Sequence, residues 1–94
     1  MKYNIEAFEY FKKQLISFDF KTKQIIKRKI SLLETNPYHF KRIKGFQLDL
    51  FRIRVKDKRV IYVVDNFTVK ILFILDRKYD YKDLPKYLRK LGYL

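Results

Sequence analysis

The chain has 94 residues, which is enough for one compact domain over residues 1–94 and too few for two. It is 48% hydrophobic and 18% aromatic, which excludes a disordered basic tail, and it has no cysteine for a disulfide framework or a thiolate metal site. Lysine and arginine number 23 against 10 acidic residues. The net charge of +13 is typical either of a protein that binds a polyanion or of a generally lysine-rich surface.

We expect the protein to act in the cytoplasm, without a membrane partner. No run of apolar residues approaches the roughly 18 that cross a bilayer, and the opening stretch has no apolar core of the signal-peptide type. Small secreted basic proteins usually depend on disulfides, which this chain cannot form.

The first half of the chain predicts a short strand and two helices. Residues 3–7 suit the strand, and from Phe8 onward apolar residues recur at steps of three and four, which is one face of a helix. Asp19 stands where an N-cap is needed for a second helix over residues 21–34. Pro37 disfavours helical geometry in the residue before it and closes that helix.

The second half changes to the period of strands and ends in a short helix. Three strands are predicted, over residues 51–55, 60–64 and 69–75, and the C-terminal helix over residues 85–91. Lys56-Asp57 and Asp65-Asn66 are the predicted turns between the strands. The order β-α-α-β-β-β-α predicts an α+β fold with the helices on one face of a small antiparallel sheet.

The stretch "LFRIRVKDKRVIY" predicts a hairpin with arginines on one side. A two-residue turn at Lys56-Asp57 sets Arg54 opposite Arg59 and Arg52 opposite Ile61, so that all three arginines share one face. Guanidinium groups held in this way suit phosphate, because each presents a planar fork of N–H donors. The alternative is that they are simply the wet side of an amphipathic strand.

The basic charge is concentrated around this hairpin. Residues 41–59 hold eight basic and two acidic residues, a net +6 of the total +13. The basic residues of this segment are Lys41, Arg42, Lys44, Arg52, Arg54, Lys56, Lys58 and Arg59. We expect those outside the arginine set to contact RNA phosphates.

A second constellation follows the last predicted strand. Arg77 and Lys78 precede Tyr79 and Tyr81, and basic residues beside tyrosines are what single-stranded RNA recognition uses. The tyrosines could instead pack at the edge of the core, with Arg77 paired to a neighbouring aspartate. An odd-length loop or a bulge would place Arg77 on the face of Arg59, and an even-length loop would oppose them.

Other chemistries find no support in the sequence. His39 is the single histidine, and Gly45 and Gly92 are too few for a phosphate-binding glycine loop. The aspartates fall mainly at predicted turns and strand ends, which does not suggest a two-metal site. We therefore expect no metal and no cofactor.

The segments "NPYHFKRIKGFQLDLFRIRVKDKRVIYVVD" and "ILFILDRKYDY" resemble the RelE/ParE superfamily of toxins, on its RelE side. The most specific elements of the resemblance are Gly45, Arg52-x-Arg54, Arg59-Val-Ile-Tyr and Arg77-x-x-x-Tyr81, in this order. The resemblance implies a small antiparallel sheet with two N-terminal helices, in agreement with the pattern above.

The resemblance also implies an activity: metal-independent endoribonuclease cleavage of messenger RNA in the ribosomal A site, with a ribose 2′-hydroxyl as nucleophile. By position, Arg52 and Arg54 match basic residues that contact the RNA and help activate the 2′-oxygen, and Arg59 matches the arginine that stabilises the phosphorane-like charge. Arg77 matches a basic residue suited to protonating or stabilising the 5′-oxygen leaving group, and Tyr81 the aromatic that stacks or orients bases.

The partners implied are the ribosome with its message and a cognate RelB-like antitoxin. An acidic amphipathic helix of the antitoxin would suit the C-terminal residues Tyr87, Leu88 and Leu91, which could equally be core packing. The alternative functions are a ParE-like inhibitor of DNA gyrase and a non-catalytic module that binds RNA or the ribosome.

Overall fold

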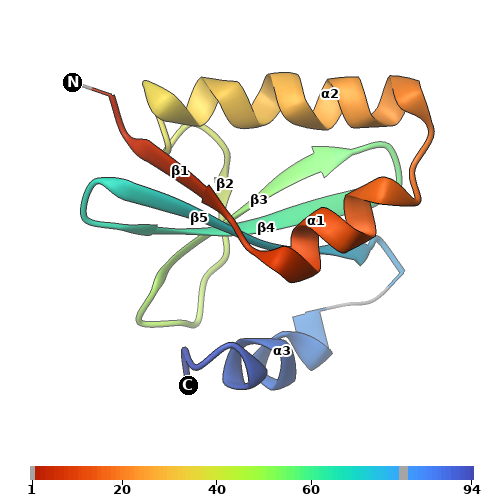
Figure 1. The fold of residues 1–94 in the computed structure, drawn as a ribbon. Coiled ribbons are helices and arrows are strands. Elements are labelled where there is room, and N and C mark those ends of the chain that lie inside the picture. The colour runs from red at the N-terminus through yellow and green to blue at the C-terminus, as the bar shows by residue number, and fades with distance from the viewer. Residues whose placement is uncertain (1, 79–80) are drawn as a thin grey trace.

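A five-stranded sheet forms the centre of the molecule, with helices on both of its faces (Figure 1). The computed structural model describes residues 2–78 and 81–94. In chain order the elements are β1 (Asn4–Ala7), α1 (Glu9–Ile16), α2 (Phe20–Ser31), the 3-10 turn η1 (Leu32–Glu34), β2 (Lys41–Arg42), β3 (Asp49–Val55), β4 (Lys58–Asp65), β5 (Thr68–Asp76), the 3-10 turn η2 (Tyr81–Asp83) and α3 (Leu84–Lys90). The predicted α+β class is confirmed, with all the predicted helices and strands. The two-residue strand β2 was not predicted.

The strands lie in the order β1-β5-β4-β3-β2. The three pairs from β2 to β5 are antiparallel, as predicted, whereas β1 runs parallel to β5 and makes the sheet mixed. The connection from β1 to β5 passes through two helices and three strands. So long a connection leaves the direction of the first strand open, while the short turns of the other strands dictate antiparallel pairing.

The first face of the sheet is covered by α1 and α2. Phe11 of α1 and Ile26 of α2 are buried against the strand residues that point toward them. Among these, Tyr62 donates its hydroxyl to the carbonyl of Pro37 at 2.7 Å, which anchors the connection after α2. The predicted cap of α2 is confirmed: Asp19 accepts from the Thr22 hydroxyl at 2.6 Å and from its amide at 3.2 Å, and these bonds lower the pKa of Asp19.

The second face is partly covered by α3, which corrects the prediction that the helices share one face (Figure 1). Leu84 and Leu88 of α3 are fully buried against Ile61, Val63 and the second side of β5. The reason lies in β4 and β5, whose runs are apolar on both sides and would otherwise expose a large apolar surface. No helix in the described ranges combines the length and the apolar character needed to pass through a bilayer.

Two tight turns set the register of the three long strands. The first is Lys56-Asp57, as predicted, with Lys56 at φ 55°. The second is Asn66-Phe67, one residue later than predicted, because Asp65 still pairs with Thr68. Asn66 has φ 56°, a left-handed conformation that asparagine tolerates better than most residues.

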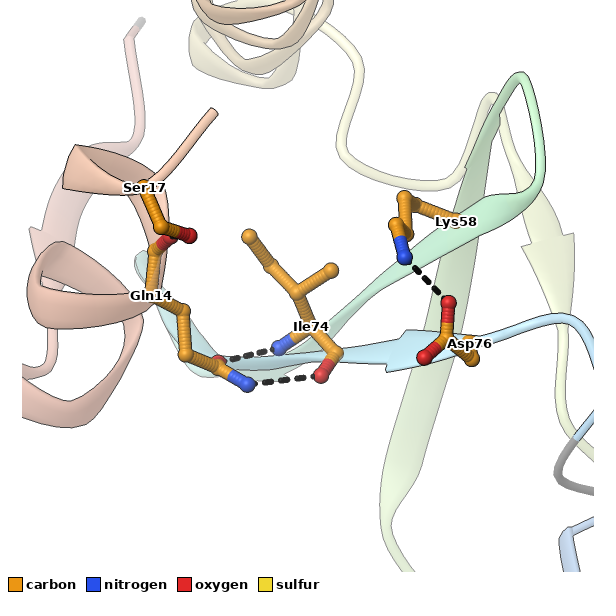
Figure 2. Close-up of polar contacts among 5 residues, drawn as sticks. All are labelled: Gln14, Ser17, Lys58, Ile74 and Asp76. Carbon is orange, nitrogen blue, oxygen red and sulfur yellow. Dashed lines mark hydrogen bonds and ion pairs between the residues drawn. The ribbon is translucent and has the colours of Figure 1, made fainter. Parts of the chain in front are cut away.

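The free edge of β5 is covered by one side chain of α1. β1 pairs only with residues 68–71, so within the described chain the rest of β5 lacks a neighbouring strand on this side. Gln14 takes its place: its Oε1 accepts from the amide of Ile74 at 2.6 Å and its Nε2 donates to the Ile74 carbonyl at 2.8 Å (Figure 2). The glutamine amide therefore acts as a substitute for strand backbone.

Candidate nucleic-acid interface

The β3–β4 hairpin places three arginines on one face of the sheet. Arg54 lies opposite Arg59, and Arg52 opposite Ile61, which is the predicted register. The alternate residues of both strands point to the other face and join the apolar cluster under α1 and α2. We call Arg52, Arg54 and Arg59 the arginine cluster; it occupies the part of the second face beside α3.

The arginine cluster is not neutralised by carboxylates of the described chain. The ion pairs between described residues involve other cations, and none includes Arg52, Arg54, Arg59 or Arg77. Like charges set opposite each other on a sheet repel, so the cluster costs stability unless an anion binds. Its five-donor guanidinium groups are well suited to phosphate.

Arg77 lies by strand alternation on the side of Arg59. Leu75 pairs with Arg59, and Arg77 follows two residues later, just beyond the end of β5. Its amide donates to the carbonyl of Asp57 at 2.7 Å, which continues the pairing into the hairpin turn. The loop between β4 and β5 has an even length, which alone would place Arg77 and Arg59 on opposite faces. A register shift at Ile61/Tyr62 reverses this effect of the loop. With this bulge, strand alternation continued into the turn after β5 favours the side of Arg59 for Arg77.

Tyr81 lies directly against the arginine cluster. The Cζ atom of Arg59 is 5.2 Å from the centroid of the Tyr81 ring, a cation–π contact. Tyr81 also packs against the apolar cluster around α3. The alternative prediction for this tyrosine, packing at the edge of the core, is therefore correct for its ring, which at the same time contacts Arg59.

A groove of about 350 Å³ adjoins the cluster. It is lined by Lys41, Arg42, Ile43, Lys44, Arg52 and Tyr81. Lys41 pairs with Arg52 across β2 and β3 and so shares its face. Ile43, which is buried, gives the groove an apolar contribution that sequence reasoning missed; the signal was a single apolar residue within the basic run "KRIKG".

Three of the predicted RNA-binding cations are engaged elsewhere. Arg42 makes an ion pair with Asp49 at 2.7 Å at the rim of the groove. Lys56 and Lys58 lie toward the first face: Lys56 donates to the hydroxyl of Thr22 at 3.0 Å, and Lys58 pairs with Asp76 (Figure 2). The hydrogen bond that Lys58 donates to the carboxylate of Asp76 raises the pKa of Lys58.

The segment after β5 is only partly described. Lys78 is exposed and lines a second pocket of about 430 Å³ with Arg77, Asp57 and Asp76. Tyr79, predicted to bind RNA, lies outside the described residues. No group of three or more histidine, cysteine or acidic side chains in the described chain is arranged to hold a metal ion.

The predicted antitoxin-binding residues pack on the sheet. Leu88 is fully buried, and Tyr87 and Leu91 lie against the same apolar cluster. The ring of Tyr87 is 5.3 Å from that of Phe73. Leu88 is thus covered in this conformation, whereas Tyr87 and Leu91 are half-buried and line a small pocket with Tyr10 and Phe73.

Several solved structures of RelE toxins have a fold similar to that of this chain. The RelE–RelB complex from Pyrococcus horikoshii is similar over 85% of this chain and 100% of that chain, with 28% identity and a TM-score of 0.73. A mutant of the Escherichia coli toxin RelE in the free state is similar over 98% and 99%, with 15% identity and a TM-score of 0.79. The RelBE2 complex from Mycobacterium tuberculosis is similar over 82% and 100%, with 18% identity and a TM-score of 0.69.

These likenesses define the class: a small α+β toxin fold of the RelE type. Residues 7–90 match the family described as the ParE toxin of the type II toxin–antitoxin system parDE. The chain belongs to this toxin family, within the RelE/ParE superfamily that its motifs predicted. No curated protein is similar enough in sequence to match it.

Proposed function

We propose that this toxin acts in the cytoplasm as a metal-independent endoribonuclease, which cuts messenger RNA in the A site of the ribosome. The observation that supports the proposal is the arginine cluster, which shares one face of a rigid hairpin and has no carboxylate partner in the described chain. A domain with a net charge of +13 is drawn to RNA, and the cluster gives that attraction a fixed geometry.

In the proposed reaction, the ribose 2′-oxygen attacks the neighbouring phosphorus. A bond from the 2′-oxygen to phosphorus forms, the bond from phosphorus to the 5′-oxygen breaks, and the upstream product ends in a cyclic phosphate. Negative charge grows on the phosphorane oxygens, where Arg59 stabilises it, and on the leaving 5′-oxygen, which lies toward Arg77 and takes up a proton from water. Such preorganised charge is often the largest single contribution to catalysis.

Arg52 and Arg54 align the 2′-hydroxyl instead of deprotonating it. A guanidinium group keeps its proton at neutral pH and is therefore a poor general base. The 2′-hydroxyl proton passes to water or to a ribosomal group, and the gain from this toxin comes from alignment and electrostatic stabilisation.

The flanking phosphates are assigned to the cations nearest the cluster. Lys41 and Lys44 line the adjoining groove, and Lys78 lies beside Arg77. Arg42, Lys56 and Lys58 were expected to take part as well, but their contacts with Asp49, Thr22 and Asp76 leave them a minor share.

Primer extension on messages bound to ribosomes tests the activity. We expect a new 3′ end within the A-site codon with the wild-type protein. Salt-sensitive binding without a cut product would support a non-catalytic module instead. Because the matched family is named for ParE, DNA gyrase is the second target: loss of supercoiling before loss of translation after induction would favour it.

We further propose a RelB-like antitoxin as the partner, since the similar structures from P. horikoshii and M. tuberculosis are toxin–antitoxin complexes. An acidic amphipathic helix would replace α3 on the sheet and contact Tyr87, Leu88 and Leu91 or the surface that they cover. Hydrogen exchange tests this: the amides of α3 should lose protection in the complex. Unchanged protection of α3 would contradict displacement.

A further inference from the structure

The contact between Tyr81 and Arg59 leaves two polar atoms without partners. The Nε atom of Arg59 and the hydroxyl of Tyr81 are both buried and make no hydrogen bond. Their burial results from the stacked arrangement, in which the guanidinium Cζ lies 5.2 Å from the ring centroid. An orphaned N–H group is normally costly, but the negative face of an aromatic ring offers partial compensation.

The ring of Tyr81 is half-buried. It packs on the apolar cluster that includes Leu75, Leu84 and Leu88. The hydroxyl contributes no hydrogen bond, so the ring is the part of Tyr81 that acts on Arg59. The ring is thus in contact with both the guanidinium and the apolar cluster.

Arg59 needs such a support because of its neighbour. Arg54 lies directly opposite it in the hairpin, and the two positive charges repel. An unsupported Arg59 would turn its guanidinium away from Arg54 and from the centre of the cluster. A cation–π contact opposes this motion and leaves the terminal nitrogens as the donors for an external phosphate.

We propose that Tyr81 is a positioning residue for Arg59. The proposal rests on the ribonuclease function proposed above and deepens it: the ring fixes the guanidinium that stabilises the phosphorane. Its effect should therefore fall on the rate of the cut and not on RNA affinity. Base stacking would show the reverse, because each stacked base contributes mainly to binding.

The kinetic test compares two substitutions at one position. Tyr81→Leu keeps an apolar side chain but removes the ring, and it should lower kcat by about tenfold or more while KM changes less than about threefold. Tyr81→Phe should recover most of the lost rate. A rise in KM of about tenfold with kcat retained would overturn the proposal in favour of stacking, and failure of Tyr81→Phe to recover the rate would overturn it in favour of a chemical role for the hydroxyl.

A second test needs no ribonuclease activity. Phenylalanine at position 81 is replaced by analogues with one to three fluorines, which weaken the negative face of the ring at nearly constant shape. The unfolding equilibrium should shift toward unfolding in steps, by roughly 2- to 30-fold in total, with Arg59 present. In the Arg59→Leu background the same series of analogues should leave the unfolding equilibrium unchanged. Equal slopes in both backgrounds would refute the contact.

Tyr87 provides a matched control in the same apolar cluster, since its ring lies against Phe73. The fluorine series at position 87 should not depend on residue 59. If the wild-type protein cuts no message, the proposed ribonuclease function fails, whereas the dependence on residue 59 still decides whether Tyr81 holds Arg59.

Discussion

The two faces of the hairpin hold their cations in different ways. Toward the first face, Lys58 has a carboxylate partner and Lys56 donates to a hydroxyl oxygen. On the second face, the arginine cluster lies without a carboxylate partner in the described chain, and one of its members faces a second arginine directly across the strands. The same short stretch of sequence thus contains neutralised and unneutralised charge, a few residues apart.

This difference teaches that net charge alone does not locate a binding site. A total of +13 says only that the protein attracts anions, whereas the partners of each cation say which ones remain available to an external phosphate. Repulsion between Arg54 and Arg59 is a cost to the free protein. A stable fold that retains such a cost is expected where the charges serve a ligand.

The largest expected effect is on catalysis at the second face. Arg59→Ala should lower single-turnover cleavage on programmed ribosomes by about 10²–10³-fold, because it removes one donor to the phosphorane. Arg77→Ala should have a similar effect. Lys70→Ala is the control, since it removes one charge from β5 that is already paired with Asp65 at 3.6 Å. A loss as large in the control as in Arg59→Ala would show that overall charge, and not the cluster, carries the activity.

The next effect is on stability at the edge of β5. Gln14→Ala removes both hydrogen bonds to the backbone of Ile74 and should lower the free energy of unfolding by about 2 kcal/mol, at about 1 kcal/mol for each bond. Urea denaturation measures this loss in the free energy of unfolding. Ser17→Ala, which removes only an exposed bond to the carbonyl of Gln14, should cost less than about 0.5 kcal/mol. Equal losses would mean that Gln14 does not support the edge.

A smaller effect of opposite sign is expected within the cluster. Arg54→Gln should raise the free energy of unfolding by about 0.2–1 kcal/mol, because it relieves the repulsion with Arg59, while it lowers cleavage. The gain should shrink at high salt, where the repulsion is screened. Thermal melts at two salt concentrations measure it, and a destabilised variant would contradict the account of uncompensated charge.

The smallest effect concerns the paired cation of the first face. The pKa of Lys58 is raised in the folded state, so the pair with Asp76 stabilises fully below the ordinary lysine pKa and loses its effect as pH rises through the raised value. The contribution of the pair, measured as the difference in stability between wild type and Lys58→Met, should be a few tenths of a kcal/mol near pH 7 and should be lost as pH rises through the raised pKa. A difference that grows with pH would have the wrong sign.

Local turn chemistry made much of the site predictable. The two-residue turn at Lys56-Asp57 fixes the pairing of Arg54 with Arg59, and strand alternation does the rest. The position of Arg77 could not be predicted, because it depends on a bulge at Ile61/Tyr62 that has no signal in the sequence. Bulges respond to packing between strands and are not encoded by a turn residue.

The remaining misses come from tertiary context. The sequence showed that β4 and β5 are apolar on both sides, but it did not show that α3 would cover the second side of the sheet. It predicted RNA contacts for Arg42, Lys56 and Lys58 from the run of basic residues, which does not reveal their contacts with Asp49, Thr22 and Asp76. The direction of β1 depended on a partner far along the chain.

The most direct measurement compares two triple variants that each remove three positive charges. One changes Arg52, Arg54 and Arg59 to glutamine. The other makes the same change at three residues on the exposed side of α2, namely Lys21, Lys27 and Arg28. Primer extension on ribosome-bound message should show no cut with the first variant and cleavage within about threefold of wild type with the second. Equal loss in both, or cleavage that survives without the arginine cluster, would contradict the central claim.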